Sequence, residues 1–107
     1  MTMGGHPLAD KKVLERCVQF HKALSNPVRL RIVEELLQRE LCQCEIFPKI
    51  GLAQSTLSSY LSQLVRVGIL AERRDGQRKL YRIANERIAN LLELTKKTLQ
   101  EVIEGTS

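Results

Sequence analysis

Apolar residues recur along this chain at helical spacing, and the first such run predicts an amphipathic helix. Between residues 10 and 24 an apolar side chain appears every three or four positions, so these side chains share one helix face. Residues 1–9 lack this pattern, and we expect them to be disordered. The stripe consists of Val13, Cys17, Phe20 and Leu24.

The sequence SNP at residues 25–27 predicts the end of this helix and the start of a second. Asn26 is a favourable N-cap, and Pro27 suits the first helical position because its missing N–H would have no partner there. A short third helix is expected from about Glu45 to Ile50, ending at Gly51. The apolar residues of the second helix are Leu30, Ile32, Val33, Leu36 and Leu37.

Residues 53–68 predict a fourth helix with two unlike faces. Leu57, Leu61 and Leu64 form an apolar stripe, which Val65 widens. The opposite face carries small hydroxyl and amide side chains of low helix propensity, so a role other than stability must favour them. This polar face comprises Gln54, Ser55, Ser58, Ser59 and Ser62, with Gln63 beside it.

Two short extended runs surround Asp75 and Gly76 within residues 69–83. Asp-Gly between such runs is a strong signal for a β-hairpin, because glycine accepts a positive φ at little cost. The expected tip is polar and mostly basic, and it carries Arg73, Arg74, Gln77, Arg78 and Lys79.

A long last helix is expected over residues 86–103, with Asn85 as its cap. Its apolar seam steps by four and three residues, as in a heptad repeat, and Leu91 and Leu94 add a second apolar flank. A terminal helix that is apolar on more than one flank needs a second surface, which predicts a homodimer. The alternative is that one flank packs on the core of its own chain. The seam consists of Ile88, Leu92, Thr95, Leu99 and Val102.

The length of 107 residues is that of a single domain, and a hydrophobic content of 43% is sufficient for a core. No apolar run of about 18 residues occurs, so we expect no membrane-spanning segment. The first residues lack the apolar stretch of a secretory signal, so we expect a cytoplasmic protein. In that compartment three cysteines indicate metal binding or redox sensing better than disulfide scaffolding.

The basic charge of the chain is concentrated in one segment. Residues 49–82 hold seven basic and two acidic residues, so this segment accounts for the whole net charge of +5. A neutral scaffold with one basic segment is typical of a nucleic-acid binder; the alternative is a solvated basic surface without a partner.

The third helix, the turn at Gly51, the fourth helix and the hairpin together predict a winged helix-turn-helix. The expected fold is mainly α with a small β-hairpin, in the order α-α-α-α-β-β-α, as one domain over residues 1–107. In this motif the second helix of the pair lies in the major groove, where Gln can pair with adenine and Ser can donate or accept. Wing arginines reach phosphates or the minor groove. The expected DNA-contacting residues are Gln54, Ser55, Thr56, Ser58, Ser59, Gln63, Arg73, Arg74, Gln77, Arg78 and Lys79.

In three blocks that occur in the family's order, the chain resembles the ArsR/SmtB family of metal-sensing bacterial and archaeal repressors. The blocks are ALSNPVRLRIVEELL, ELCQCEI and GLAQSTLSSYLSQLVRVGILAERRDGQRKLYRI, and the resemblance covers about residues 12–103. It implies a homodimer formed through helices 10–24 and 86–103. It also implies a double-stranded DNA operator with an inverted repeat, which the repressor leaves when an ion binds.

Cys42 and Cys44 match the Cys-x-Cys that opens the third helix in the arsenic, cadmium and lead branches of the family. Phe47 stands where many arsenic sensors carry a further cysteine. A third thiolate would therefore have to come from Cys17 on the first helix, in the same or the other subunit. No histidine follows residue 21, so the helical zinc site of other members is absent.

Thiolates favour thiophilic ions over hard cations, and three sulfurs suit pyramidal As(III). The expected effector is As(III), with Cd(II), Pb(II) or Zn(II) as alternatives at the same cysteines, and no catalytic cofactor is expected. Zn(II) usually takes four ligands, and His21 could supply the fourth, although a core or interface position is the commoner role. Cys17 has the alternative role of a small apolar core residue.

Other chemistry of the thiols leads to different functions. A redox sensor would oxidise the same cysteines and respond to peroxide or diamide without metal. A thiol oxidoreductase would need a Cys-x-x-Cys at a helix start in a βαβ setting, which the sequence lacks. Ser/His/Asp, Walker and Rossmann patterns are also absent, so we expect a non-enzymatic regulator.

Helix geometry constrains how Cys42 and Cys44 can share an ion. Residues two apart on a helix point about 200° away from each other, whereas two sulfurs on one ion must lie roughly 4 Å apart or less. Pro48 has no N–H for the carbonyl of Cys44, and its ring clashes with that carbonyl in a helix. We therefore expect the third helix to begin at or after Cys44, with the thiols in an extended lead-in.

Overall fold

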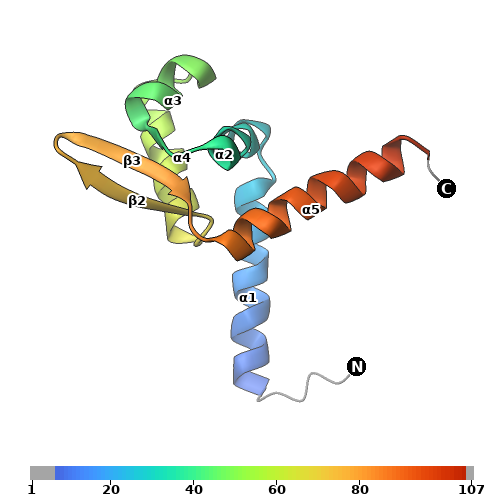
Figure 1. Ribbon diagram of the computed structural model, residues 1–107. Coiled ribbons are helices and arrows are strands. Elements are labelled where there is room, and N and C mark those ends of the chain that lie inside the picture. The colour runs from blue at the N-terminus through green and yellow to red at the C-terminus, as the bar shows by residue number, and fades with distance from the viewer. Residues whose placement is uncertain (1–6, 106–107) are drawn as a thin grey trace.

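The computed structural model describes residues 7–105 and has a helical body with a projecting β-hairpin (Figure 1). The mainly helical, winged helix-turn-helix fold expected from the sequence is confirmed. None of the helices in the described part of the chain is long and apolar enough to cross a membrane. The elements are α1 (Pro7–Leu24), α2 (Pro27–Gln38), β1 (Leu41–Cys42), α3 (Gln43–Ile50), α4 (Gln54–Arg66), β2 (Leu70–Asp75), β3 (Arg78–Ile83) and α5 (Glu86–Ile103).

Side-chain caps set the starts of α2 and α5, and a glycine sets the end of α3, as the sequence predicts. The Asn26 side chain accepts hydrogen bonds from the backbone N–H groups of Val28 and Arg29, at 2.8 and 2.9 Å. The side chain of Asn85 does the same for Ile88 at 2.9 Å. Gly51 ends α3 with a φ of 78°, a conformation in which a Cβ would be strained.

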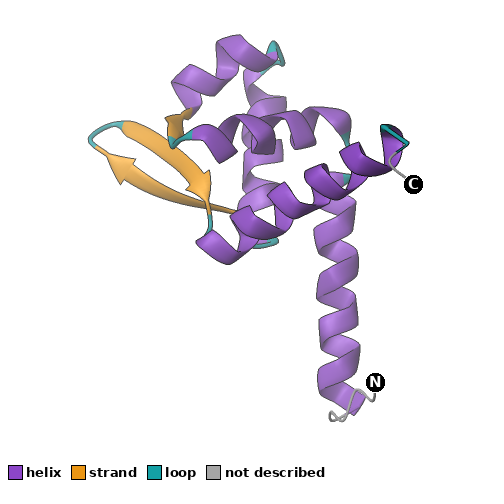
Figure 2. Cartoon of the chain, turned by 45° about the vertical axis from the view of Figure 1, so that its right-hand side comes forward, coloured by secondary structure: helices purple, strands orange, loops and turns teal. Residues whose placement is uncertain are grey.

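The sheet contains one strand that was not predicted. The hairpin of β2 and β3 forms as expected, but Asp75 is the last residue of β2 and the two-residue turn is Gly76 and Gln77. The strand β1 adds to the other side of β3, giving the antiparallel order β1-β3-β2. The short β1 lies between α2 and α3 (Figure 2). Cys42 of β1 stands opposite Leu80 of β3, and Leu41 stands opposite Tyr81, so the segment that carries the first cysteine is part of the same sheet as the wing.

The core is made mainly by one apolar face from each of α2, α3 and α4, together with the start of the hairpin. On α4 the side chains of Leu57, Leu61 and Leu64 are each 0% exposed, so the predicted stripe is confirmed. Burying this stripe turns the polar face of α4 away from the core, towards solvent. The other core residues include Ala23, Ile32, Val33, Leu36, Leu41, Ile46, Ile69, Leu70, Tyr81 and Leu92.

Two expectations about helix starts were wrong. The first helix begins at Pro7, so residues 7–9 are helical instead of disordered, while residues 1–6 lie outside the described part of the chain. The third helix begins at Gln43, before Cys44. Pro48 removes one hydrogen bond from this helix, but the Glu45 carboxylate accepts one from the Cys42 N–H at 2.9 Å and stabilises the first turn.

Candidate functional site

The polar face of α4 is open to solvent over its first two turns. Gln54, Ser55, Ser58 and Ser59 are exposed, and Thr56 and Gln63 are partly exposed. Because Leu57 and Leu61 are held in the core, the helix cannot rotate these side chains away from the surface. This face presents hydroxyl and amide groups that can read the edges of bases.

The wing carries the second part of the predicted DNA surface. Arg73, Arg74, Gln77 and Arg78 are exposed, and Lys79 is half-buried. Two of the cations are paired with acids of the hairpin itself: Arg78 with Asp75 at 3.2 Å and Lys79 with Glu72 at 3.8 Å. Exposed pairs of this kind are weak, so phosphates can compete for these cations.

Arg73 makes a different contact, because its partner lies outside the hairpin. Its guanidinium donates two hydrogen bonds to the Glu40 carboxylate, at 2.8 and 2.9 Å. The hydrogen bonds from Arg73 lower the pKa of Glu40, and the carboxylate raises the pKa of Arg73 in turn. The wing is thereby tied to the residue that stands two positions before Cys42.

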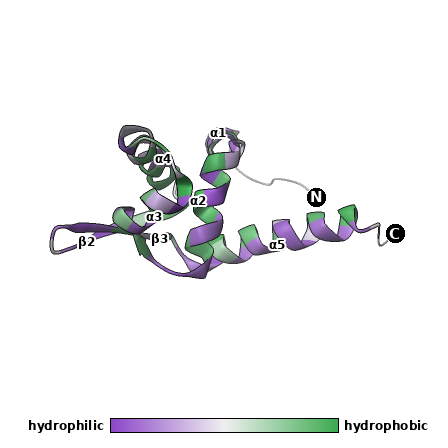
Figure 3. Ribbon diagram, turned by 90° about the horizontal axis from the view of Figure 1, so that it is seen from above, coloured by the Kyte–Doolittle hydropathy of each residue, from purple (hydrophilic) through white to green (hydrophobic). Residues whose placement is uncertain are grey.

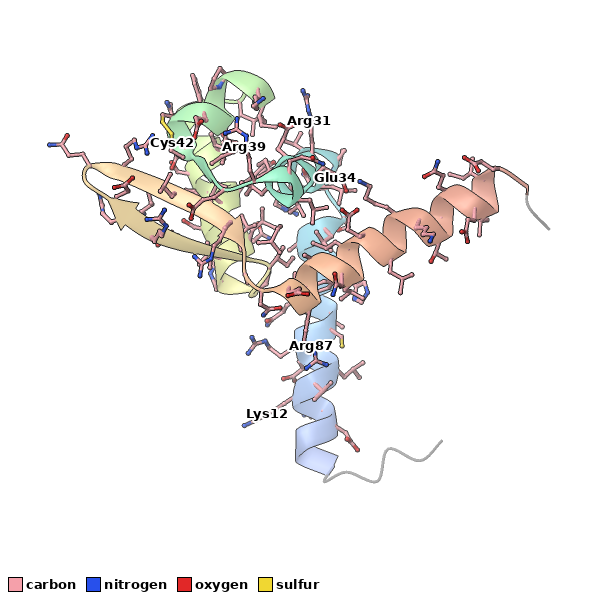
Figure 4. The ribbon with its side chains drawn as sticks, in the orientation of Figure 1. Lys12, Arg31, Glu34, Arg39, Cys42 and Arg87 are labelled. Atoms are coloured by element: carbon pink, nitrogen blue, oxygen red, sulfur yellow. A yellow bond between two sulfur atoms is a disulfide. The ribbon has the colours of Figure 1, made fainter. Side chains whose placement is uncertain are left out.

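Cys42 and Cys44 are brought together at the start of α3 (Figure 4) and are joined by a disulfide, with their Cα atoms 5.2 Å apart. Cys42 is an extended N-cap with φ −80° and ψ 159°, whereas Cys44 is already helical. This break in backbone conformation lets two side chains two positions apart point to the same place. Cys42 is 1% exposed and Cys44 is exposed, so a reagent from solvent reaches the pair through Cys44.

Gln43, which stands between the two cysteines, contacts α4, the helix predicted to lie in the major groove. Its side-chain Nε2 donates a hydrogen bond to Oγ of Ser58 at 2.7 Å. No pattern in the sequence signals this contact or the contact between Glu40 and Arg73, because the partners are 15 and 33 positions apart. An isolated Gln or Glu in a basic segment has many equally plausible partners until the fold is known.

The structure does not bring Cys17 to the other two cysteines within one chain. Cys17 is exposed on α1 in the single chain. His21 uses Nδ1 to donate a hydrogen bond to the Cys17 carbonyl at 2.7 Å, and its ring packs edge-on against Phe20. Over residues 7–105 no three Cys, His, Asp or Glu side chains are grouped as a metal site.

A groove of about 890 Å³ lies between α1 and α5 and is lined mainly by apolar side chains. Hydrophobic residues recur along α5 to its far end, beyond the reach of the helical body (Figure 3). Lys96 of α5 pairs with Glu34 of α2 at 2.7 Å, which is a contact between the body and the second half of α5. The exposed apolar residues of the two helices are Val13, Leu14, Val18, Leu91, Leu94, Leu99, Val102 and Ile103.

Comparison with known proteins identifies relatives that match most of the chain. The family model described as bacterial regulatory protein, arsR family, matches residues 26–72, which include α2, the cysteine pair and α4. The chain is 41% identical over 86 residues to an HTH-type transcriptional regulator of Mycobacterium tuberculosis, covering 79% of this chain and 75% of the relative. It is 38% identical over 85 residues to the cadmium resistance transcriptional regulatory protein CadC of Listeria innocua, covering 78% and 71%.

A solved structure agrees with the fold over nearly the whole chain. It is the homodimeric winged helix-turn-helix DNA-binding domain of a possible ArsR-family transcriptional regulator of Mycobacterium bovis. The TM-score is 0.89 at 33% sequence identity, and the match covers 96% of this chain and 95% of that one. The order of helices and the wing are therefore shared with a DNA-binding domain.

Proposed function

Since the chain belongs to the ArsR family of bacterial regulatory proteins, and is a DNA-binding transcription regulator rather than an enzyme, we propose that it is a homodimeric repressor controlled by its cysteines. In this proposal the α4 helices of two copies enter successive major grooves of an inverted repeat, and the wings contact the flanking backbone. Binding of As(III) to Cys42 and Cys44 lowers the affinity for DNA.

The observation that carries this proposal is the position of the two sulfurs. Cys42 and Cys44 lie side by side at the first helix of the helix-turn-helix, with Cys44 open to solvent. Two adjacent thiolates favour thiophilic ions, and Cd(II), Pb(II) and Zn(II) can use them as well as As(III). The likeness to the cadmium regulator of Listeria innocua supports an ion as the effector but leaves its identity to experiment.

A third ligand would come from Cys17 of a second copy of the chain. Cys17 is exposed on α1 beside the apolar groove, and a homodimer would cover this surface. A thiolate supplied across the interface would give As(III) the three sulfurs that its pyramidal geometry favours. On this arrangement the ion site is complete in the dimer, where it bridges the two chains.

Thiol oxidation is the second candidate, and the disulfide between Cys42 and Cys44 favours it. In this reaction the two thiols lose two protons and two electrons and form one S–S bond. Hydrogen peroxide takes them up as its O–O bond breaks to give two waters, and diamide takes them up at its N=N bond to give a hydrazine. No metal is needed, so the two candidates can be separated by reagent.

The experiment that tests this function starts by selecting a DNA duplex from a random pool with the reduced protein. The complex is then titrated with As(III), Cd(II), Pb(II), Zn(II) and diamide, and dissociation is followed by fluorescence anisotropy. We expect As(III) to dissociate the complex and to shift the midpoint of binding by tenfold or more, a factor of about the usual size for allosteric coupling. Dissociation by diamide alone would select the redox mechanism. A complex that survives all five reagents would refute regulation through the cysteines.

Replacing the exposed wing cations tests the backbone contacts. We expect Arg74→Ala and Arg78→Ala to weaken binding to the selected duplex and to random DNA by the same factor. Each lost phosphate contact should also lower the slope of log K against log salt by about one counterion. Arg87→Ala is the control, because Arg87 is exposed at the start of α5, away from the wing tip (Figure 4). A change of sequence preference in the wing variants would contradict the assignment.

The exposed residues of α4 are expected to behave in the opposite way. Gln54→Ala should alter which base is preferred, and each good contact to a base discriminates by about 1–3 kcal/mol. Binding to random DNA should change little, because this contact carries no charge. Repeating the selection with the variant and comparing the enriched sequences measures the effect. Equal losses on selected and random DNA would remove Gln54 from the recognition surface.

A further inference from the structure

Two side chains next to the cysteine pair hold residues that we expect to touch DNA. Glu40, just before β1, binds the Arg73 guanidinium of the wing through two hydrogen bonds of 2.8 and 2.9 Å. The side-chain Nε2 of Gln43, between the two cysteines, donates a hydrogen bond of 2.7 Å to the Ser58 hydroxyl on α4. One short segment, residues 40–44, therefore carries both thiols and contacts both DNA-binding elements.

The sheet reinforces the link to the wing. Cys42 pairs with Leu80 of β3, and Leu80 pairs on its other side with Arg73 of β2. Cys42, Leu80 and Arg73 thus lie in one row across the three strands. Because β1 pairs with β3 and β3 pairs with β2, a shift of β1 at Cys42 moves the sheet that positions Arg73.

We infer that Glu40 and Gln43 are the positioning residues through which the cysteine pair controls DNA binding, an inference that rests on the function proposed above. Joining the two sulfurs, directly or through one atom, fixes the backbone of Gln43 and the residues beside it. Glu40 then competes with a phosphate for Arg73, and Gln43 competes with a base for Ser58. With the sulfurs apart, the segment is freer and both partners are released to DNA more readily.

The ion pairs inside the hairpin provide a matched comparison. Glu72 is also a carboxylate that pairs with a wing cation, Lys79, at 3.8 Å. Its partner lies within the hairpin, so it does not connect the wing to the cysteines. Glu40→Gln and Glu72→Gln remove the same charge from the same surface, and both should tighten DNA binding. The first variant alone should change how strongly the cysteines control that binding.

The test uses the reduced protein, in which Cys42 and Cys44 are thiols, and phenylarsine oxide, which joins two neighbouring thiols through a single arsenic atom. Its oxo group leaves as water with the two thiol protons, two As–S bonds form, and no electron is transferred. Intact mass confirms the adduct. The measured quantity is the ratio of dissociation constants for the selected duplex with and without the reagent, in the unsubstituted protein and in Glu40→Gln, Gln43→Ala and Glu72→Gln.

We expect a ratio of about tenfold or more in the unsubstituted protein. The ratio should fall about threefold in Glu40→Gln and in Gln43→Ala, which corresponds to the loss of one exposed hydrogen-bonded contact. Glu72→Gln should keep the full ratio. Unchanged ratios in both Glu40→Gln and Gln43→Ala would overturn the inference while leaving the proposed function intact, and so would an equal fall in Glu72→Gln. A ratio of one in the unsubstituted protein would overturn the control by cysteines itself, and the inference with it.

Discussion

Cys44→Ser is expected to bind DNA as tightly as the unsubstituted protein and to lose its release by As(III) entirely. Cys44 is exposed, so in the reduced protein a serine in its place leaves the core of the helix-turn-helix undisturbed. A hydroxyl is a hard, neutral oxygen at neutral pH and cannot replace a thiolate on As(III). The release factor, expected to be tenfold or more, should therefore fall to about one.

Two further variants show whether the loss is specific. Cys42→Ser should give the same result, with some cost in stability because Cys42 is 1% exposed and its hydroxyl would be buried. Cys17→Ser should weaken the response without abolishing it if a second copy supplies Cys17 as third ligand. Anisotropy titrations of the three variants with As(III) make the comparison. Release that persists in a protein lacking both Cys42 and Cys44 would place the sensor elsewhere.

Leu99→Glu is expected to separate the dimer and to reduce affinity for the inverted repeat by about 100-fold or more, since two linked half-sites bind far more tightly than one. Leu99 is 55% exposed in the single chain and lines the groove between α1 and α5. A carboxylate there would be buried against apolar side chains in a dimer and would cost more than the interface can supply. The fold of the single chain should persist, because Leu92 is the α5 residue that is buried in its core.

Asn90→Glu is the control for this variant. Asn90 is exposed on the same helix, about half a turn round from Leu99, and the substitution adds the same charge. Analytical ultracentrifugation gives the mass of each variant, and circular dichroism confirms that the helices remain. A Leu99→Glu protein that stays dimeric would contradict the assignment of this groove to the dimer interface.

The sequence predicted well those features that repeat or that depend on local backbone chemistry. The stripe of Leu57, Leu61 and Leu64 is confirmed because a 3.6-residue period has one buried face, whatever the partner. The hairpin is confirmed because a glycine in the turn accepts a positive φ: Gly76 has a φ of 66°, and the turn lies one residue later than predicted, at Gly76 and Gln77. These signals lie within a few residues of the structure that they determine.

Features that depend on distant partners could not be predicted in this way. The strand at Leu41–Cys42 is too short to show a period, and it exists because β3 offers an unpaired edge. The start of α3 was misplaced because Pro48 was weighed without the Glu45 contact that stabilises the first turn. The link from Gln43 to Ser58 joins two helices and becomes visible once they pack together.

The cysteine pair and the DNA surface are expected to be energetically coupled. The affinity for As(III), measured with and without DNA, tests that coupling most directly. By linkage, an ion that weakens DNA binding by some factor must itself bind the DNA complex more weakly by the same factor. Isothermal titration of the reduced protein with As(III), free and saturated with the selected duplex, gives both constants. We expect the DNA complex to bind As(III) at least about tenfold more weakly than the free protein does. This factor should equal the one by which As(III) weakens DNA binding. Equal affinities would contradict the account, even if the cysteines bind the ion.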